Sequence, residues 1–282
     1  MSTNLQIAVW SHPVNESVIR ALEEAYPDGI HRGSATEARA LLEAGRVHAA
    51  LLPSNEALAG QDVLEVLPAV AVSSWTNPWA TLMVGGQLGA ATMGIMHQPE
   101  GRPGALLAAM VLKEHYRTVV ALHERDRLPD GLSEHALITV PLSKDGDAQA
   151  PAPLPDTGQG VALDLGQEWS EMSGYPFVWS LFACRKDEAT AELIMTLRDV
   201  VQQLDEQRVE KERAWNLDEV SSDFFLNHLR LTLDDLAIAS LTEFCDHLYF
   251  YGVTEEILPV QFASLPRDAA SAQSTPAQST PV

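Results

Sequence analysis

Short apolar runs alternate with stretches of helical spacing through the first half of the chain. The run LQIAVW at 5–10 precedes a helical stretch at 15–25, and a second helical stretch at 35–44 precedes the apolar run at 47–52. Further runs predict strands at 64–72, 80–84 and 92–97. Strands that alternate with helices indicate an α/β fold with a mostly parallel sheet, in which ligands bind off the carboxyl ends of the strands.

The second half of the chain begins with another α/β block and ends in helices. The block has predicted helices at 103–116 and 164–173, an exposed loop at 143–160, and predicted strands at 119–122, 136–140 and 176–183. Late helices are predicted at 189–213, 217–229 and 234–251. We therefore expect two lobes with a ligand cleft between them, followed by a disordered tail. The expected ranges are 1–84 plus 181–265 for the first lobe, 85–180 for the second and 266–282 for the tail.

The charge of the chain is strongly negative, with 39 Asp plus Glu against 18 Lys plus Arg and a formal net charge of −21. Such a field repels phosphate backbones and anionic lipid, so neither nucleic acid nor a membrane is an expected partner. The N-terminal sequence has no basic region followed by a long apolar core, and no apolar run reaches the ~20 residues of a membrane span. We expect a cytoplasmic protein whose two cysteines, Cys184 and Cys245, are reduced and buried.

Three common kinds of catalytic site leave no local signal in the sequence. The nine histidines form no HxxxH or HxH pair, and the cysteines form no CxxC pair, so we expect no metal. The segment GGQLGAATMG at 85–94 lacks the spacing and the lysine of nucleotide-binding loops, and a turn is the simpler interpretation. Ser54 lacks the GxSxG elbow, and Cys184 lies in an apolar run. We therefore expect neither an activated nucleophile nor a cofactor.

Neutral hydrogen-bond donors gather where the predicted strands end. They are Ser11, His12, Asn15, Ser54, Asn55, Asn77 and Thr81. Taken singly, each fits a helix cap or a turn, and Asn15 fits a cap for the first helix. Because strand ends of a parallel sheet meet at one edge, together they predict a dry pocket for a carboxylate or hydroxyl group. His12 alone among them titrates near neutral pH, so it is the candidate for proton transfer, with a loop-orienting hydrogen bond as the alternative.

Longer motifs occur in several segments. Residues 157–186 read TGQGVALDLGQEWSEMSGYPFVWSLFACRK, residues 45–56 read GRVHAALLPSNE, and the last predicted helix ends in LTEFCDHLYFYGV. These segments resemble the MqnA/MqnD family of menaquinone-biosynthesis proteins, whose signatures are DLG-x-E-W … TG-x-PFV-x-A and G-x-VD-x-x-x-IPS-x-E. WSHPVN at 10–15 places Asn15 on the family asparagine, and NPWATLMV at 77–84 places Thr81 on the family serine. The resemblance extends to about Leu265.

The resemblance implies a two-lobed fold like that of type II periplasmic binding proteins, with the ligand held between the lobes. For the MqnA branch it also implies chorismate dehydratase activity, a lyase step of the futalosine route. That step removes the ring hydroxyl and a neighbouring proton from chorismate and yields 3-[(1-carboxyvinyl)oxy]benzoate. Aromatisation drives the reaction, so the protein mainly positions and desolvates its substrate. A pocket of neutral donors suits that task.

The strand-end donors and the resemblance together define the candidate site. Asn15 and His12 are the expected catalytic residues, and the expected substrate-binding residues are Ser11, Ser54, Asn77, Thr81 and Arg102. Arg102 is included because HQPEGRP at 97–103 stands where the family has a TSxTS-like turn, and a guanidinium could grip a carboxylate there. Trp75 and Trp79 could stack on a ligand ring or pack between the lobes.

Alternatives to this function remain open. A non-catalytic paralogue could bind a small carboxylate in the same cleft, and the missing TSxTS turn favours it. An MqnD-type cyclase, acting on a nucleoside-like futalosine derivative, would need a larger pocket and a base. Because a negative field slows the approach of anions, we expect the acidic residues of the late helices, at 199, 205, 206, 210, 212, 234 and 235, to face solvent away from the cleft. The sequence leaves the oligomeric state open.

Overall fold

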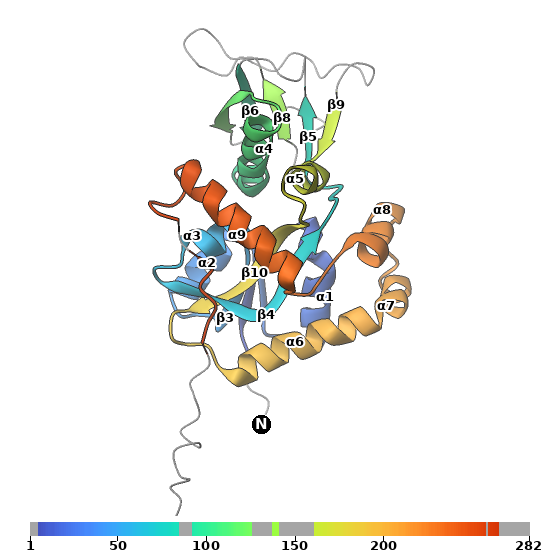
Figure 1. Ribbon diagram of the computed structural model, residues 1–282. Coiled ribbons are helices and arrows are strands. Elements are labelled where there is room, and N and C mark those ends of the chain that lie inside the picture. Colours follow the sequence, from blue (N-terminus) through green and yellow to red (C-terminus); the bar gives the residue numbers. More distant parts are fainter. Residues whose placement is uncertain (1–4, 85–91, 126–136, 141–160, 258, 265–282) are drawn as a thin grey trace, which may run out of the picture.

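The structure is a computed structural model that describes residues 5–84, 92–125, 137–140, 161–257 and 259–264. Within these residues the chain forms two five-stranded sheets, which lie in separate lobes (Figure 1). The strand order is β2-β1-β3-β10-β4 in the first sheet and β7-β6-β8-β5-β9 in the second. The predicted α/β fold with two lobes is therefore confirmed.

The first sheet is built from β1 (Ile7–Trp10), β2 (Ile30–Gly33), β3 (Ala49–Pro53), β4 (Leu64–Ser74) and β10 (Phe177–Arg185). β1 pairs in parallel with β2 and β3, whereas β10 runs antiparallel between β3 and β4. Every residue of β1 and β3 is buried, which explains their unbroken apolar runs. β2 was not predicted, because its sequence IHRG exposes two polar side chains at the edge of the sheet.

Helices α1 (Glu16–Ala25), α2 (Ala35–Glu43) and α3 (Ser54–Ala59) belong to the first lobe. α1 is amphipathic and buries Val18, Ile19 and Leu22 in the core. α2 begins with a capping box, in which the side chain of Ser34 accepts a hydrogen bond from the Glu37 backbone and the Glu37 side chain accepts one from the Ser34 backbone. The helices predicted at 15–25 and 35–44 are confirmed; α3 was not predicted.

The second sheet contains β5 (Thr81–Val84), β6 (Thr92–His97), β7 (Val119–Glu124), β8 (Leu137–Val140) and β9 (Val161–Asp164). Its helices are α4 (Arg102–Glu114) and α5 (Leu165–Ser173), and a short 3-10 helix, η2 (Pro99–Gly101), leads into α4. The carboxylate of Asp164 caps α5 by accepting hydrogen bonds from the backbone of Gly166 at 2.9 Å and Gln167 at 3.1 Å. α5 ends at Ser173, and the following Gly174 has a φ of 80°, in the left-handed region that favours glycine.

The chain passes between the lobes after β4 and again between α5 and β10. β5 begins at Thr81 and lies in the second sheet, and β10 begins at Phe177 and lies in the first. The changes of sheet thus come before the expected lobe boundaries at 84 and 180. An apolar run predicts a strand but does not say which sheet the strand joins. The sequence pattern therefore puts both lobe boundaries a few residues later than the changes of sheet.

The late helices are α6 (Ala191–Glu206), α7 (Arg208–Trp215), α8 (Glu219–Asp223), a π-helix (Phe224–His228) and α9 (Asp235–Phe250). The continuous helix predicted at 189–213 is wrong, because the backbone of Gln207 leaves the helical region with φ −110° and ψ 19°. α9 crosses between the lobes (Figure 1). Ser240 on this helix accepts a hydrogen bond from Trp169 Nε1 of α5 at 3.2 Å, so α9 ties the second lobe to the first.

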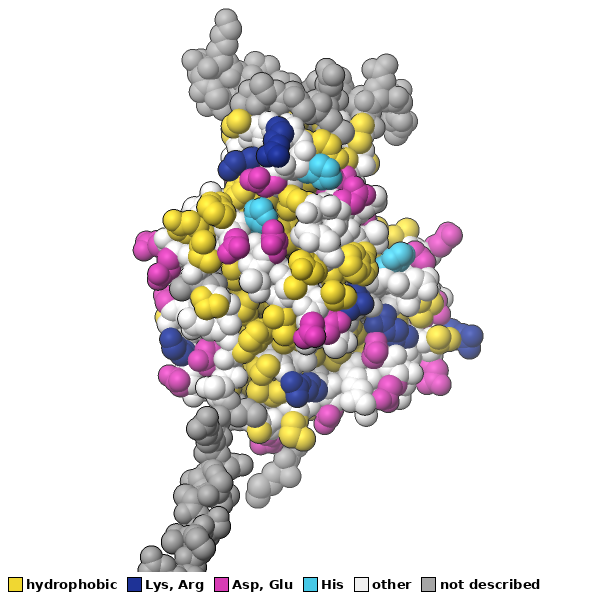
Figure 2. Space-filling view, viewed as in Figure 1, with side chains coloured by type: hydrophobic (Ala, Val, Ile, Leu, Met, Phe, Trp, Pro, Cys, Tyr) yellow, Lys and Arg dark blue, Asp and Glu magenta, His cyan; other side chains and the backbone are white. Residues whose placement is uncertain are grey.

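Five of the seven acidic residues predicted to face solvent on the late helices do so, and none of the seven lines the pocket between the lobes described below. Asp199, Asp205, Glu206, Glu210 and Asp235 are exposed, and Glu212 and Asp234 are half-buried. On the face shown in Figure 2, acidic side chains are spread out rather than gathered in one hollow. The loop expected at 143–160, most of the turn at 85–94 and the tail at 266–282 lie outside the described residues. Among the described helices, none is long and apolar enough to cross a membrane.

Candidate functional site

A small pocket lies between the two lobes, at the carboxyl ends of β1 and β3. Its volume is about 30 Å³, room for a water molecule but not for a six-membered ring. The first lobe contributes Trp10, His12, Ser54 and Asn55, and the second contributes the start of α4 through Gly101, Pro103 and Gly104. The other lining residues are Trp79, Ala80, Phe177, Trp179 and Phe244. We call this the interlobe pocket; binding a larger ligand requires the lobes to part.

His12 occupies the loop between β1 and α1 and is buried, with 9% of its surface exposed. Its Nδ1 accepts a hydrogen bond from the backbone of Val14 at 3.2 Å, and its ring lies against Trp10 with centroids 4.4 Å apart. Because Nδ1 is an acceptor, the neutral ring carries its proton on Nε2. His12 therefore makes the expected loop-orienting hydrogen bond, and the same side chain also lines the interlobe pocket.

Ser54 and Asn55 begin α3 directly after β3, and both line the interlobe pocket. The hydroxyl of Ser54 donates to the carbonyl of Val178 on β10 at 2.5 Å, so its proton is already engaged. Asn55 is 7% exposed, and no described residue hydrogen-bonds to its side-chain amide. At the end of β3, the side-chain amide of Asn55 can therefore both donate a hydrogen bond to a ligand and accept one from it.

Asn15 lies behind the pocket rather than in its wall. Its side chain is fully buried; Nδ2 donates to the carbonyl of Trp10 at 3.1 Å, and Oδ1 accepts from the hydroxyl of Ser180 at 2.5 Å. It makes no side-chain capping bond to α1, contrary to the expectation. These contacts tie the end of β1 to β10, so the geometry makes Asn15 a residue that positions the His12 loop.

Asn77 and Thr81 belong to the crossing from β4 to β5 and do not line the interlobe pocket. The backbone N–H of Asn77 donates to the Asp164 carboxylate at 2.8 and 2.9 Å, and its side-chain oxygen accepts from the backbone of Trp79 at 3.0 Å. The hydroxyl of Thr81 donates to the carbonyl of Pro78 at 3.3 Å. Both side chains therefore shape the crossing segment.

Arg102 and Ser11 lie outside the interlobe pocket as well. Arg102 is the exposed first residue of α4 and forms no ion pair with any described residue. Ser11 is exposed and lines a second, larger hollow of about 510 Å³ beside the pocket, which we call the lateral cavity. His12 and Trp79 line both spaces and form the wall between them. Trp75, by contrast, is 38% exposed and lines neither.

Tryptophan and phenylalanine make up five of the twelve residues that line the interlobe pocket, and three of them carry no site signal in the sequence. Phe177 and Trp179 lie in a run that predicts only a buried strand, and Phe244 lies within a late helix. The ring of Trp179 is held by a hydrogen bond from Nε1 to the Ser74 hydroxyl at 2.8 Å, and it contacts Phe177 edge to face at 4.7 Å. The order in which strands pair brings these rings together, so spacing along the chain could not reveal them.

His12 is the one ionisable side chain among the described residues that line the interlobe pocket. No Asp, Glu, Lys or Arg is among the described residues that line it, and the described residues contain no group of three side chains arranged to hold a metal. Burial raises the pKa of the Cys184 thiol to about 12 and that of Cys245 to about 11, so both thiols stay protonated and unreactive. The chemistry of the pocket therefore comes from hydrogen bonding, desolvation and one imidazole.

Several solved structures share this architecture at low sequence identity. Protein AF1704 from Archaeoglobus fulgidus is 15% identical, with a TM-score of 0.58 over 90% of this chain and 100% of that one. The aliphatic sulphonate-binding protein SsuA from Escherichia coli is 10% identical, with a TM-score of 0.51 over 98% of this chain and 97% of that one. CA3427 of Candida albicans, which has the generic periplasmic binding protein fold, is 12% identical, with a TM-score of 0.52 over 94% and 98%.

These likenesses confirm the periplasmic-binding-protein-like fold: two α/β lobes with a pocket between them. A sequence profile of the family described as menaquinone biosynthesis matches residues 5–249. The chain belongs to this menaquinone-biosynthesis family, as its motifs predict. A search of curated proteins finds no match.

Proposed function

We propose that the protein is a chorismate dehydratase-like lyase that acts in the interlobe pocket. Membership of the menaquinone-biosynthesis family supports a role in that pathway. The observation that carries the proposal is the make-up of the pocket: neutral donors, aromatic walls and a single titratable group, His12, where both lobes meet. Such a pocket suits an elimination that is driven by aromatisation and needs orientation and a dry site more than a strong base.

In the proposed reaction the substrate loses its ring hydroxyl and the proton on the neighbouring ring carbon as one water molecule, and the ring becomes aromatic. His12 lines the pocket on a loop that its own Nδ1 orients by accepting from the Val14 backbone, and its imidazole would lie beside the departing hydroxyl. The Asn55 amide and the backbone at the start of α4, where Gly101 and Gly104 leave the main chain uncovered, would hold a carboxylate. Asn15 acts indirectly, by fixing the His12 loop.

The substrate must enter while the lobes are apart, because the closed pocket holds only about 30 Å³. Closure would then expel water and bring the start of α4 against the ends of β1 and β3. The crossing segment around Asn77, fastened to Asp164 by two hydrogen bonds, is the place where such a hinge would bend. Asn77 and Thr81 would then act on the hinge and not on the ligand.

Purified protein incubated with chorismate tests the proposal, with 3-[(1-carboxyvinyl)oxy]benzoate identified by mass spectrometry and followed by absorbance. Product formation that scales with protein concentration is expected. No turnover at high protein concentration would reject the lyase assignment.

A non-catalytic carboxylate-binding protein is the second candidate, and two observations favour it. The start of α4 reads Gly101, Arg102, Pro103, Gly104 and offers no hydroxyl side chain, and SsuA, a structural neighbour, binds aliphatic sulphonates, which are small organic anions. This candidate predicts that chorismate raises the melting temperature without being consumed.

A further inference from the structure

The lateral cavity lies beside the interlobe pocket and is not used by the proposed reaction. It lies between the first turn of α1 and the segment from α7 to the π-helix, with a volume of about 510 Å³. That volume falls in the range of small-molecule sites in proteins. Its lining includes four aromatic residues, Trp79, Trp215, Phe224 and Phe225, of which the two phenylalanines are buried.

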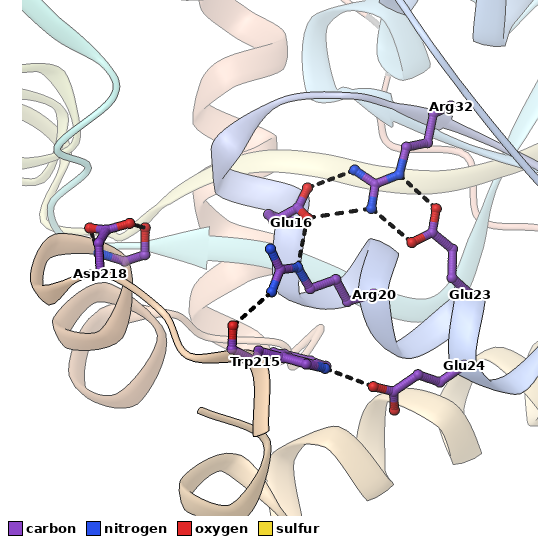
Figure 3. A network of polar contacts seen from close by, with 8 residues as sticks. Glu16, Arg20, Glu23, Glu24, Arg32, Trp215 and Asp218 are labelled. Atoms are coloured by element: carbon purple, nitrogen blue, oxygen red, sulfur yellow. Dashed lines mark hydrogen bonds and ion pairs between the residues drawn. The ribbon is translucent and has the colours of Figure 1, made fainter. Parts of the chain in front are cut away.

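Arg20 of α1 places a cation in this cavity. Its Nε donates to Glu16 Oε1 at 2.8 Å and its Nη1 donates to the carbonyl of Trp215 at 3.4 Å (Figure 3). No described residue accepts from its Nη2, and the side chain is 35% exposed. Two N–H groups of a guanidinium are thus available to a ligand in the cavity.

The neighbouring charges leave Arg20 able to attract an anion. Glu16 lines the cavity but is shared, since Arg32 donates to its Oε2 at 2.8 Å while Arg20 holds its Oε1. Figure 3 shows the Glu16 carboxylate between the two guanidinium groups, whereas Asp218 lies apart on the segment that enters α8. Asp218 also lines the cavity and opposes an anion, but it is exposed and is occupied with capping Ser221.

Trp215 is held rigidly as a wall of the cavity. Its Nε1 donates to Glu24 Oε1 at 2.7 Å, and the guanidinium carbon of Arg20 lies 5.7 Å from the centre of its ring. A ring that is already fixed loses little conformational freedom when a ligand packs against it. The cavity therefore combines a preformed aromatic surface with a single available guanidinium.

We propose that the lateral cavity is a second ligand site, which binds a small aromatic carboxylate with its ring against the aromatic side chains and its carboxylate on Arg20. The site does not depend on the reaction proposed above. Because His12 and Trp79 line both spaces, a ligand here lies directly beside the interlobe pocket.

Calorimetric titration of the full chain with benzoate, and with uncharged benzamide as a matched ligand, tests the site. Benzoate is expected to bind with one-site stoichiometry and about tenfold more tightly than benzamide. Arg20→Gln should weaken benzoate binding at least about tenfold and leave benzamide almost unchanged. Asp218→Asn should strengthen benzoate binding about twofold, because it removes the opposing charge at the exposed rim.

Two control variants locate the ligand. Arg39→Gln removes a comparable arginine of α2, which is paired with Glu43 at i,i+4 but lies outside the cavity, and should leave benzoate affinity unchanged. Asn55→Ala alters the interlobe pocket and should also leave it unchanged. If Asn55→Ala abolishes benzoate binding while Arg20→Gln does not, or if benzoate does not bind, the proposal is overturned. If Arg20→Gln fails to fold, Arg20→Met replaces it: loss of the preference for benzoate over benzamide in a folded protein supports the site, and retention of that preference contradicts it.

Discussion

Ser180 in the centre of β10 donates its hydroxyl to the side-chain oxygen of Asn15 at 2.5 Å, and both residues are fully buried. The other end of the Asn15 amide donates to the carbonyl of Trp10, the last residue of β1. One side chain thus joins two strands immediately behind the loop that carries His12. These two hydrogen bonds predict that Asn15 stabilises the fold, an effect that can be measured independently of catalysis.

Removing one partner of this pair should destabilise the protein. Ser180→Ala leaves the buried Asn15 oxygen without a donor, and we expect the free energy of unfolding in urea to fall by about 1–3 kcal/mol. Ser170→Ala is the matched control, because the Ser170 hydroxyl donates to a backbone carbonyl at the surface and should cost less than about 0.5 kcal/mol. Equal losses of unfolding free energy in the two variants would show that the buried Asn15 contact stabilises the protein no more than the surface hydrogen bond of Ser170.

His12 should be required for turnover but not for folding. His12→Asn keeps a side-chain acceptor for the Val14 backbone, so stability should change little, while kcat for chorismate should fall at least about 100-fold. His48→Asn is the control, since His48 Nδ1 also accepts a backbone N–H, that of Gln6 at 3.1 Å, but lies on the surface. Activity of His12→Asn equal to that of His48→Asn would remove His12 from the mechanism.

Asn55 should affect binding and stability differently. In the ligand-free protein no described residue hydrogen-bonds to its side chain, so Asn55→Leu should change the free energy of unfolding by less than about 1 kcal/mol. The same change removes a ligand contact and should raise KM for chorismate about tenfold or more. A normal KM in this variant would mean that the carboxylate binds elsewhere.

The two thiols should be unreactive in the folded protein. Burial raises the pKa of Cys184 to about 12 and of Cys245 to about 11, so neither forms much thiolate at pH 8. A thiol reagent such as Ellman's reagent should therefore label native protein only slowly and should label both residues once guanidinium unfolds the chain. Rapid labelling of either cysteine in native protein would contradict its buried position.

The hydrophobic pattern was sufficient for much of the architecture. The strand at 92–97 was predicted with the bounds it has in the structure, and the early helices follow from their spacing and capping residues. The pattern did not reveal that β10 pairs antiparallel between β3 and β4, because a buried apolar run carries no information about direction. The exposed edge strand at Ile30–Gly33 was missed for the opposite reason, since it buries too little.

The candidate site was predictable only in part. The rule that ligands bind at strand ends leads to His12, Ser54 and Asn55, which do meet in the interlobe pocket. It does not say which donors are already engaged: Asn15 is bound to Ser180, and the hydroxyl of Ser54 is bound to the Val178 carbonyl. Nor could it place Arg102, whose exposed side chain depends on how η2 leads into α4.

The most direct test of the central claim is the conversion of chorismate by the purified wild-type chain and by His12→Asn, measured side by side with product identified by mass spectrometry. We predict 3-[(1-carboxyvinyl)oxy]benzoate from the wild type and from His48→Asn, with the rate reduced at least about 100-fold in His12→Asn. Chorismate that stabilises the wild-type protein but is recovered unchanged would contradict the account and favour a carboxylate-binding protein.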